Sequence, residues 1–124
     1  MQFMMLMIPN VYRDNKSDPD FRPDPQEIEK MGRFNEELGK AVKILSLNGL
    51  HPLKSGARVS FEKGKPTVTD GPFIETKEVL GGYWMVEANS KEELVKWAQL
   101  CPAEEGDIIE IRQIFGEADF AIKK

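Results

Sequence analysis

Residues 80–88 read Leu-Gly-Gly-Tyr-Trp-Met-Val-Glu-Ala, and their pattern decides the fold. Side chains alternate between the two faces of a strand, so both faces of this stretch are apolar, with Tyr83 and Met85 on one and Trp84, Val86 and Ala88 on the other. Residues 3–8, Phe-Met-Met-Leu-Met-Ile, are equally apolar. Strands of this kind are covered on both sides of their sheet. The sequence therefore predicts that both strands lie in a sheet whose two faces are covered.

Two helices are predicted from their first residues and from apolar residues at helical spacing. The first begins at Asp24-Pro25, where Asp24 caps free backbone amides and proline takes the first helical position. We expect it to end at Asn48-Gly49, and it carries this apolar stripe: Ile28, Met31, Phe34, Leu38, Ala41, Val42 and Leu45. The second begins at Ser90, which stands three residues before Glu93 as in a capping box, and ends before Pro102.

The remaining elements complete an antiparallel sheet. Residues 57–61 and 66–69 flank a turn and predict a hairpin, and residues 108–115 predict the last strand. The order is strand, helix, hairpin, strand, helix, strand. It predicts an α+β fold with a ferredoxin-like βαββαβ plan and an extra hairpin, in which both helices cover one face of the sheet.

The second face of the predicted sheet has no helix to cover it. A second copy of the chain is the simplest cover, so we expect a homodimer that pairs through the sheet face. The alternative is a sheet whose second face is incompletely covered.

Length and composition limit the class of protein. A chain of 124 residues fits a single domain over 1–124, with a polar loop at 9–24 and a tail at 116–124. The net charge is −4 and the basic residues are scattered, so we expect no nucleic-acid binding. The apolar N-terminus is too short to span a bilayer and lacks the features of a signal peptide, which predicts a cytoplasmic protein without membrane contact. One cysteine and one histidine cannot form a His/Cys zinc site, and we expect no metal and no cofactor.

The segment between the hairpin and the strand at 80–88 carries a resemblance to a known family. Residues 69–78 read Thr-Asp-Gly-Pro-Phe-Ile-Glu-Thr-Lys-Glu and precede Leu80-Gly81-Gly82-Tyr83. This stretch resembles the signature of the DGPF-motif proteins, a branch of the YCII-related superfamily, and the similarity extends from Met1 to Phe115. The resemblance implies a dimeric ferredoxin-like α+β barrel. A His near the start of the first helix and an Asp after the second helix are a proposed catalytic pair in the wider superfamily, and this sequence has neither.

Three ionisable residues are candidate catalytic groups. His51 has the only side chain with an unperturbed pKa near neutrality, and as a general acid or base it would be oriented by Asp70 or Glu75. The plainer interpretation of His51 is an exposed loop residue beside Pro52. The plainer interpretation of Asp70 is a turn residue that bonds the backbone ahead of it.

Four further residues are candidate ligand contacts: Lys77, Arg112, Arg58 and Tyr83. Lys77 follows the turn and would bind an anion. Arg112 alternates with Ile109 and Ile111 along the last strand, so it points away from the helices. There it would bind a carboxylate ligand, or it would form an internal salt bridge near Glu110 or with Glu75.

Two functions remain open from the sequence. One is a small dimeric domain that binds or transforms a small polar metabolite by cofactor-free acid/base chemistry in a cleft near residues 70–78. The alternative is a non-catalytic interaction module linked to transcriptional control, as the association of some DGPF proteins with sigma factors implies. No nucleophile elbow, phosphate-binding glycine loop or dinucleotide fingerprint occurs in the sequence.

Overall fold

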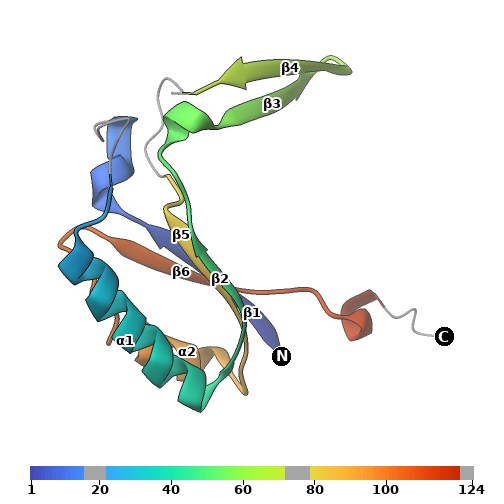
Figure 1. Ribbon diagram of the computed structural model, residues 1–124. Helices are drawn as coiled ribbons and strands as arrows, with labels where there is room; N and C mark the ends of the chain where they lie inside the picture. The colour runs from blue at the N-terminus through green and yellow to red at the C-terminus, as the bar shows by residue number, and fades with distance from the viewer. Residues whose placement is uncertain (16–21, 72–78, 121–124) are drawn as a thin grey trace.

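The computed structural model describes residues 1–15, 22–71 and 79–120 (Figure 1). Its main elements are, in chain order, β1 (Gln2–Ile8), α1 (Pro25–Ala41), β2 (Lys43–Gly49), β3 (Ala57–Glu62), β4 (Lys65–Asp70), β5 (Gly82–Glu87), α2 (Lys91–Ala98) and β6 (Ile108–Gln113). Three short 3-10 helices accompany them: η1 (Asn10–Asn15), η2 (Leu53–Ser55) and η3 (Glu117–Phe120). None of the helices in these ranges has the length and apolar character needed to cross a lipid bilayer.

Four strands form one antiparallel sheet in the order β2-β5-β1-β6. The two central strands, β1 and β5, pair with each other, while β6 pairs with β1 and β2 pairs with β5. Helix α1 connects β1 to β2 and α2 connects β5 to β6, so each crossover passes over one intervening strand. This is the predicted ferredoxin-like α+β arrangement, with β3 and β4 as the extra hairpin.

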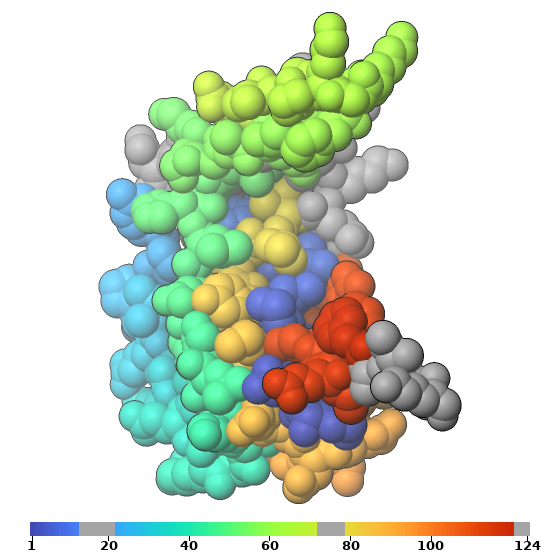
Figure 2. All heavy atoms as spheres, turned by 90° about the vertical axis from the view of Figure 1, so that its right-hand side faces the viewer, coloured from blue at the N-terminus to red at the C-terminus, as the bar shows by residue number. Residues whose placement is uncertain are grey.

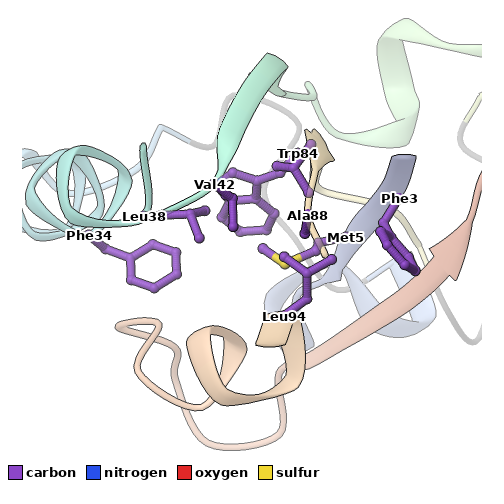
Figure 3. Packing of buried hydrophobic residues seen from close by; sticks show 9 residues of the cluster. Phe3, Met5, Phe34, Leu38, Val42, Trp84, Ala88 and Leu94 are labelled. Atoms are coloured by element: carbon purple, nitrogen blue, oxygen red, sulfur yellow. The ribbon is translucent and has the colours of Figure 1, made fainter. Parts of the chain in front are cut away.

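Both helices cover the same face of the sheet, and the main hydrophobic core lies between them and the strands (Figure 3). Four of its side chains are almost completely buried: Met5, Leu38, Val86 and Leu94. Burial of one such side chain stabilises the fold by about 1.5–3 kcal/mol. Trp84 also lies in this core, and its indole nitrogen donates to the side-chain oxygen of Asn35 at 2.7 Å.

The predicted helix starts are confirmed by their capping hydrogen bonds. The Gln26 N–H donates to the Asp24 carboxylate at 2.8 Å, and Pro25 takes the first helical position. The Glu93 N–H donates to the Ser90 hydroxyl oxygen at 3.2 Å. Both helices therefore begin at the residues that the sequence indicates.

The predicted end of the first helix is wrong. Helix α1 ends at Ala41, and Val42 already has extended backbone, with φ −133° and ψ 163°. Residues 43–49 form the edge strand β2. A β-bulge hides this strand in the sequence, because the register with β5 shifts between Ile44 and Ser46 and leaves Leu45 as the extra residue. The bulge breaks the two-residue alternation of β2. Its apolar residues therefore continue the helical spacing of α1, and the sequence pattern extends the helix too far.

The predicted hairpin is confirmed and stands clear of the four-stranded sheet at one end (Figure 1). Its strands pair from Ala57 and Asp70 at the base to Glu62 and Lys65 at the tip. The turn residues Lys63 and Gly64 both have positive φ, 50° and 78°, as a two-residue type I′ turn requires. Every residue of β3 and β4 is exposed.

The predicted polar loop and tail contain more structure than expected. Residues 10–15 form η1, where Tyr12 is buried and its hydroxyl donates to the carbonyl of Leu50 at 3.0 Å. Residues 117–120 form η3. Within these two segments, residues 16–21 and 121–124 lie outside the described residues.

Candidate functional site

Gly71 of the motif lies at the base of the hairpin, directly after β4. Its N–H donates to the carbonyl of Gly56 at 2.9 Å. A Cβ atom at this position would lie 1.7 Å from the carbonyl oxygen of Leu53, so only glycine allows η2 to pack against the hairpin base. The glycine of the motif therefore has a structural role.

Gly81 has a similar role at the other end of the same segment. A Cβ atom there would lie 2.5 Å from Cγ of Pro9. The Gly81 N–H donates to the carbonyl of Met7, and its own carbonyl accepts from the Leu50 N–H, both at 2.8 Å. The close approach at Gly81 thus joins the ends of β1 and β2 to the start of β5.

The predicted catalytic group is not assembled within the described residues. His51 and Asp70 are both exposed, and neither forms an ion pair or a side-chain hydrogen bond with another described residue. Arg58 is also exposed, on β3 of the hairpin. Glu75 and Lys77 belong to residues 72–78, which lie outside the described part of the chain.

The two other candidates, Tyr83 and Arg112, lie together on the face of the sheet that the helices leave uncovered. Figure 2 shows this face, with its four strands side by side. Cross-strand partners point to the same face, and Tyr83 is opposite Leu6 while Arg112 is opposite Met4. We call this surface the open face, and the register assigns it these residues: Gln2, Met4, Leu6, Ile8, Lys43, Ser46, Asn48, Tyr83, Met85, Glu87, Ile108, Glu110 and Arg112.

Two side chains of the edge strand β2 hold the hydroxyl group of Tyr83. The side-chain amide of Asn48 donates to it at 2.9 Å, and the hydroxyl oxygen of Ser46 lies 3.1 Å away. Both groups are able to donate to a phenolate. Their hydrogen bonds, with that of Ser46 the larger cause, lower the pKa of Tyr83 below its ordinary range and outweigh the opposing effect of partial burial. Tyr83 is therefore suited to exchange a proton with a bound molecule.

Arg112 supplies a positive charge two strands away from Tyr83. Neighbouring strands lie about 4.8 Å apart, so β5 and β6, with β1 between them, are about 10 Å apart. Arg112 is exposed and has no ion-pair partner among the described residues, so a bridge to Glu110 does not form. The predicted alternative partner, Glu75, lies outside those residues. The long side chains of Arg112 and Tyr83, which extend from these two strands on the same face, are able to contact opposite ends of one small molecule.

The surface between Tyr83 and Arg112 is apolar. Met4, Leu6 and Met85 form it, and all three are half-buried. An apolar floor with a few polar groups at its margins is the usual composition of a small-molecule site.

Two hollows elsewhere on the described surface contain none of the predicted site residues. A hollow of about 290 Å³ lies beside Phe3, Ile111 and the start of α2, and one of about 550 Å³ lies beside the end of α1 and residues 87–89. Both are at the end of the sheet away from the hairpin. Within the described ranges, no three His, Cys, Asp or Glu side chains gather as metal ligands would.

Comparison with known families assigns the chain to one of them. The family model of the YCII-related domain matches residues 1–118. The chain belongs to the YCII-related domain family. This YCII-related domain is also similar to an uncharacterized protein of Rhizobium meliloti (strain 1021), with 28% identity over 76 residues. That match covers 61% of this chain and 61% of the relative's length.

Ser46 and Asn48 are candidate site residues of this YCII-related domain that the sequence alone does not indicate. Both lie in β2, a segment expected to belong to the first helix, so neither was placed near Tyr83. The signal that could have found them is the alternation of Val42, Lys43 and Ile44 ahead of the bulge, which fits a strand.

Proposed function

We propose that this YCII-related domain binds a small carboxylate on the open face, and that Tyr83 exchanges a proton with the bound molecule. The observation that carries the proposal is the Tyr83 hydroxyl, held between Ser46 and Asn48, with its pKa lowered. A phenol in this setting gives up and regains a proton more readily than an ordinary tyrosine. The reaction class is proton transfer at an oxygen or an acidic carbon of the bound carboxylate, such as the methyl carbon beside the keto group of pyruvate.

Arg112 defines the ligand class in this proposal. Its guanidinium is exposed on the same face and has no described ion-pair partner, so it is available for a carboxylate. Planar guanidinium groups bind carboxylates through two parallel hydrogen bonds, which would fix the orientation of the ligand. The reactive end of the molecule would then extend over Met4 and Leu6 toward Tyr83.

We further propose that a second copy of the chain covers the open face. The centre of this face is apolar, and its margins carry charged residues such as Lys43, Glu87 and Glu110, a distribution that resembles a subunit interface. Closure by a second copy would exclude water from the site. Lower local polarity would strengthen the attraction between Arg112 and a carboxylate.

The proposed function is tested by the effect of simple carboxylates on the melting temperature. Acetate, lactate, pyruvate and benzoate are each added to the protein, with the corresponding primary amides as uncharged controls. We expect one or more carboxylates, and none of the amides, to raise the melting temperature. Arg112→Gln should abolish this rise, whereas Arg58→Gln, which removes an exposed arginine on the hairpin, should leave it unchanged.

The role of Tyr83 is tested separately by proton exchange. Transfer of deuterium from D2O into the methyl group of bound pyruvate is followed by NMR with the wild-type protein and with Tyr83→Phe. We expect Tyr83→Phe to retain the rise in melting temperature and to lose the exchange. If no carboxylate stabilises the wild-type protein, the ligand class is wrong and the non-catalytic interaction module becomes the better explanation.

A further inference from the structure

The hairpin has one apolar face that no described element covers. Cross-strand pairing places Val59 opposite Val68 and Phe61 opposite Pro66 on one face. The exposed fractions are 77% for Phe61, 67% for Val68 and 53% for Val59. The opposite face is polar and carries the pairs Arg58 with Thr69, Ser60 with Thr67 and Glu62 with Lys65. An isolated two-stranded hairpin is marginally stable in water, so this apolar face needs a partner surface.

The C-terminal segment, residues 114–120, carries a second exposed apolar patch. The rings of Phe115 and Phe120 pack against each other with centroids 5.2 Å apart, yet both remain more than two-thirds exposed, at 74% and 70%. The Gly116 N–H donates to the carboxylate of Asp119 at 2.7 Å and closes the turn between them. The aromatic pair is thus already formed in the single chain.

Both features project from the sheet on the side of the open face, at opposite ends of it (Figures 1 and 2). The hairpin follows the end of β2, which pairs with the start of β5, whereas Gln113 at the end of β6 pairs with Phe3 near the start of β1. When two open faces meet around a two-fold axis that reverses the strand direction, the hairpin of one copy comes opposite the C-terminal segment of the other.

The charges of the two segments are complementary. Residues 54–70 contain four basic side chains and two acidic ones, a net charge of +2. Residues 114–120 contain Glu117 and Asp119 and no basic residue, a net charge of −2. Opposite charges around an apolar contact favour the pairing of hairpin with C-terminal segment and oppose the pairing of one hairpin with another.

We propose that, in a homodimer, the apolar face of each hairpin packs against Phe115 and Phe120 of the other copy. The proposal rests on the face-to-face pairing put forward above and adds to it two equal contacts, one at each end of the paired sheets. These contacts set the orientation of the two copies, so each site would be closed by a defined part of the other chain.

Disulfide trapping tests this contact. In a Cys101→Ala background, the double variant Phe61→Cys with Phe120→Cys is oxidised and analysed on a non-reducing gel. We expect a covalent dimer, because the two positions belong to different copies and meet in the assembly. The matched control is the double variant Ser60→Cys with Phe120→Cys. Because Ser60 lies on the polar face of the hairpin, this variant should remain uncrosslinked.

The outcomes separate this proposal from the pairing on which it rests. A crosslink formed by Phe61→Cys alone would mean that hairpins meet each other, which overturns the contact. Absence of a crosslink in a protein that sediments as a dimer would also overturn it, while leaving face-to-face pairing intact. A wild-type protein that sediments as a monomer at micromolar concentration would overturn both.

Dimer dissociation gives a second, independent measurement. We expect Phe61→Ser and Phe120→Ser each to raise the dissociation constant at least tenfold. Because both remove the same contact, the double variant should be little weaker than either single one. Ser60→Ala should leave the dissociation constant unchanged. If the fold-increase for the double variant equals the product of the two single fold-increases, the proposed contact is contradicted.

Discussion

The side chain of Glu104, in the loop after α2, raises the pKa of the carboxyl group of Glu27 in the first turn of α1. The main cause is that a protonated carboxyl group can donate a hydrogen bond to its neighbour, and repulsion between the two charged carboxylates acts in the same direction. The stabilising contribution of the pair is complete below the ordinary pKa of a glutamate. It is lost as the pH rises through the raised pKa, because the two carboxylates then repel each other.

Glu104→Gln should therefore stabilise the protein at pH 7 and have little effect at pH 4. Glutamine keeps a hydrogen-bond donor for Glu27 at both values of pH. Both groups lie at the surface, so we expect a gain below about 1 kcal/mol at pH 7. Urea unfolding at the two pH values measures the difference, with Glu105→Gln as the control. An equal effect of the two variants at pH 7 would show that the gain reflects net charge alone.

The two tyrosines of the chain should titrate in separate steps. Hydrogen bonds from Ser46 and Asn48 lower the pKa of Tyr83, whereas burial raises the pKa of Tyr12. When the pH is raised into the alkaline range, the phenolate absorbance of Tyr83 should rise first and that of Tyr12 should follow at higher pH. Asn48→Ala should move only the first step to higher pH, and Tyr83→Phe should remove it. A single merged transition in the wild-type protein would argue against the special environment of Tyr83.

Cys101 should react slowly with thiol reagents in the folded protein. Its sulfur lies 3.9 Å from the sulfur of Met31, and burial, with a smaller effect of the Asp107 charge, raises the pKa of the thiol to about 11. At pH 8 only about one molecule in a thousand then carries the reactive thiolate. We expect labelling by a chromogenic disulfide reagent to be about a hundredfold slower than in guanidinium-unfolded protein. Equal rates in the two states would mean that the thiol is accessible.

Two glycine substitutions should change stability in opposite directions. A Cβ atom at Gly71 would meet the Leu53 carbonyl oxygen at 1.7 Å, so Gly71→Ala must displace η2 and should cost about 1–3 kcal/mol. Gly32 lies within α1 with nothing within 4 Å of the added atom, so Gly32→Ala should stabilise by about 0.5–1 kcal/mol. Chemical denaturation of both variants checks the pair. A neutral Gly71→Ala would show that the hairpin base does not depend on this contact.

Most of the fold follows from patterns that are local in the sequence. Alternation in the strand at residues 80–88 places Trp84 and Tyr83 on opposite faces, and this is confirmed, because Trp84 lies in the core and Tyr83 on the open face. The caps at Asp24 and Ser90 locate both helix starts. The end of α1 was not predictable in this way, because the bulge at Leu45 is stabilised by pairing with β5, a contact between distant parts of the chain.

The site depends more strongly on such distant contacts. The sequence indicates Tyr83 and Arg112 as candidates, but it favours His51 as the proton-transfer group because histidine titrates near neutrality in isolation. The environment of Tyr83 arises only when β2 pairs with β5 and brings Ser46 and Asn48 to its hydroxyl. Because the sequence pattern favours a helix where the structure has β2, this part of the candidate site is not predictable from the sequence alone.

The chain leaves the four-stranded sheet at Gly49 and returns to it at Gly82, and these two residues are direct partners across β2 and β5. Residues 50–81 are therefore a topological insertion between two paired strands of the four-stranded sheet. The strand pairings that support Tyr83 and Arg112 do not run through the hairpin. A change in the length or the side chains of the hairpin would therefore leave these strand pairings in place.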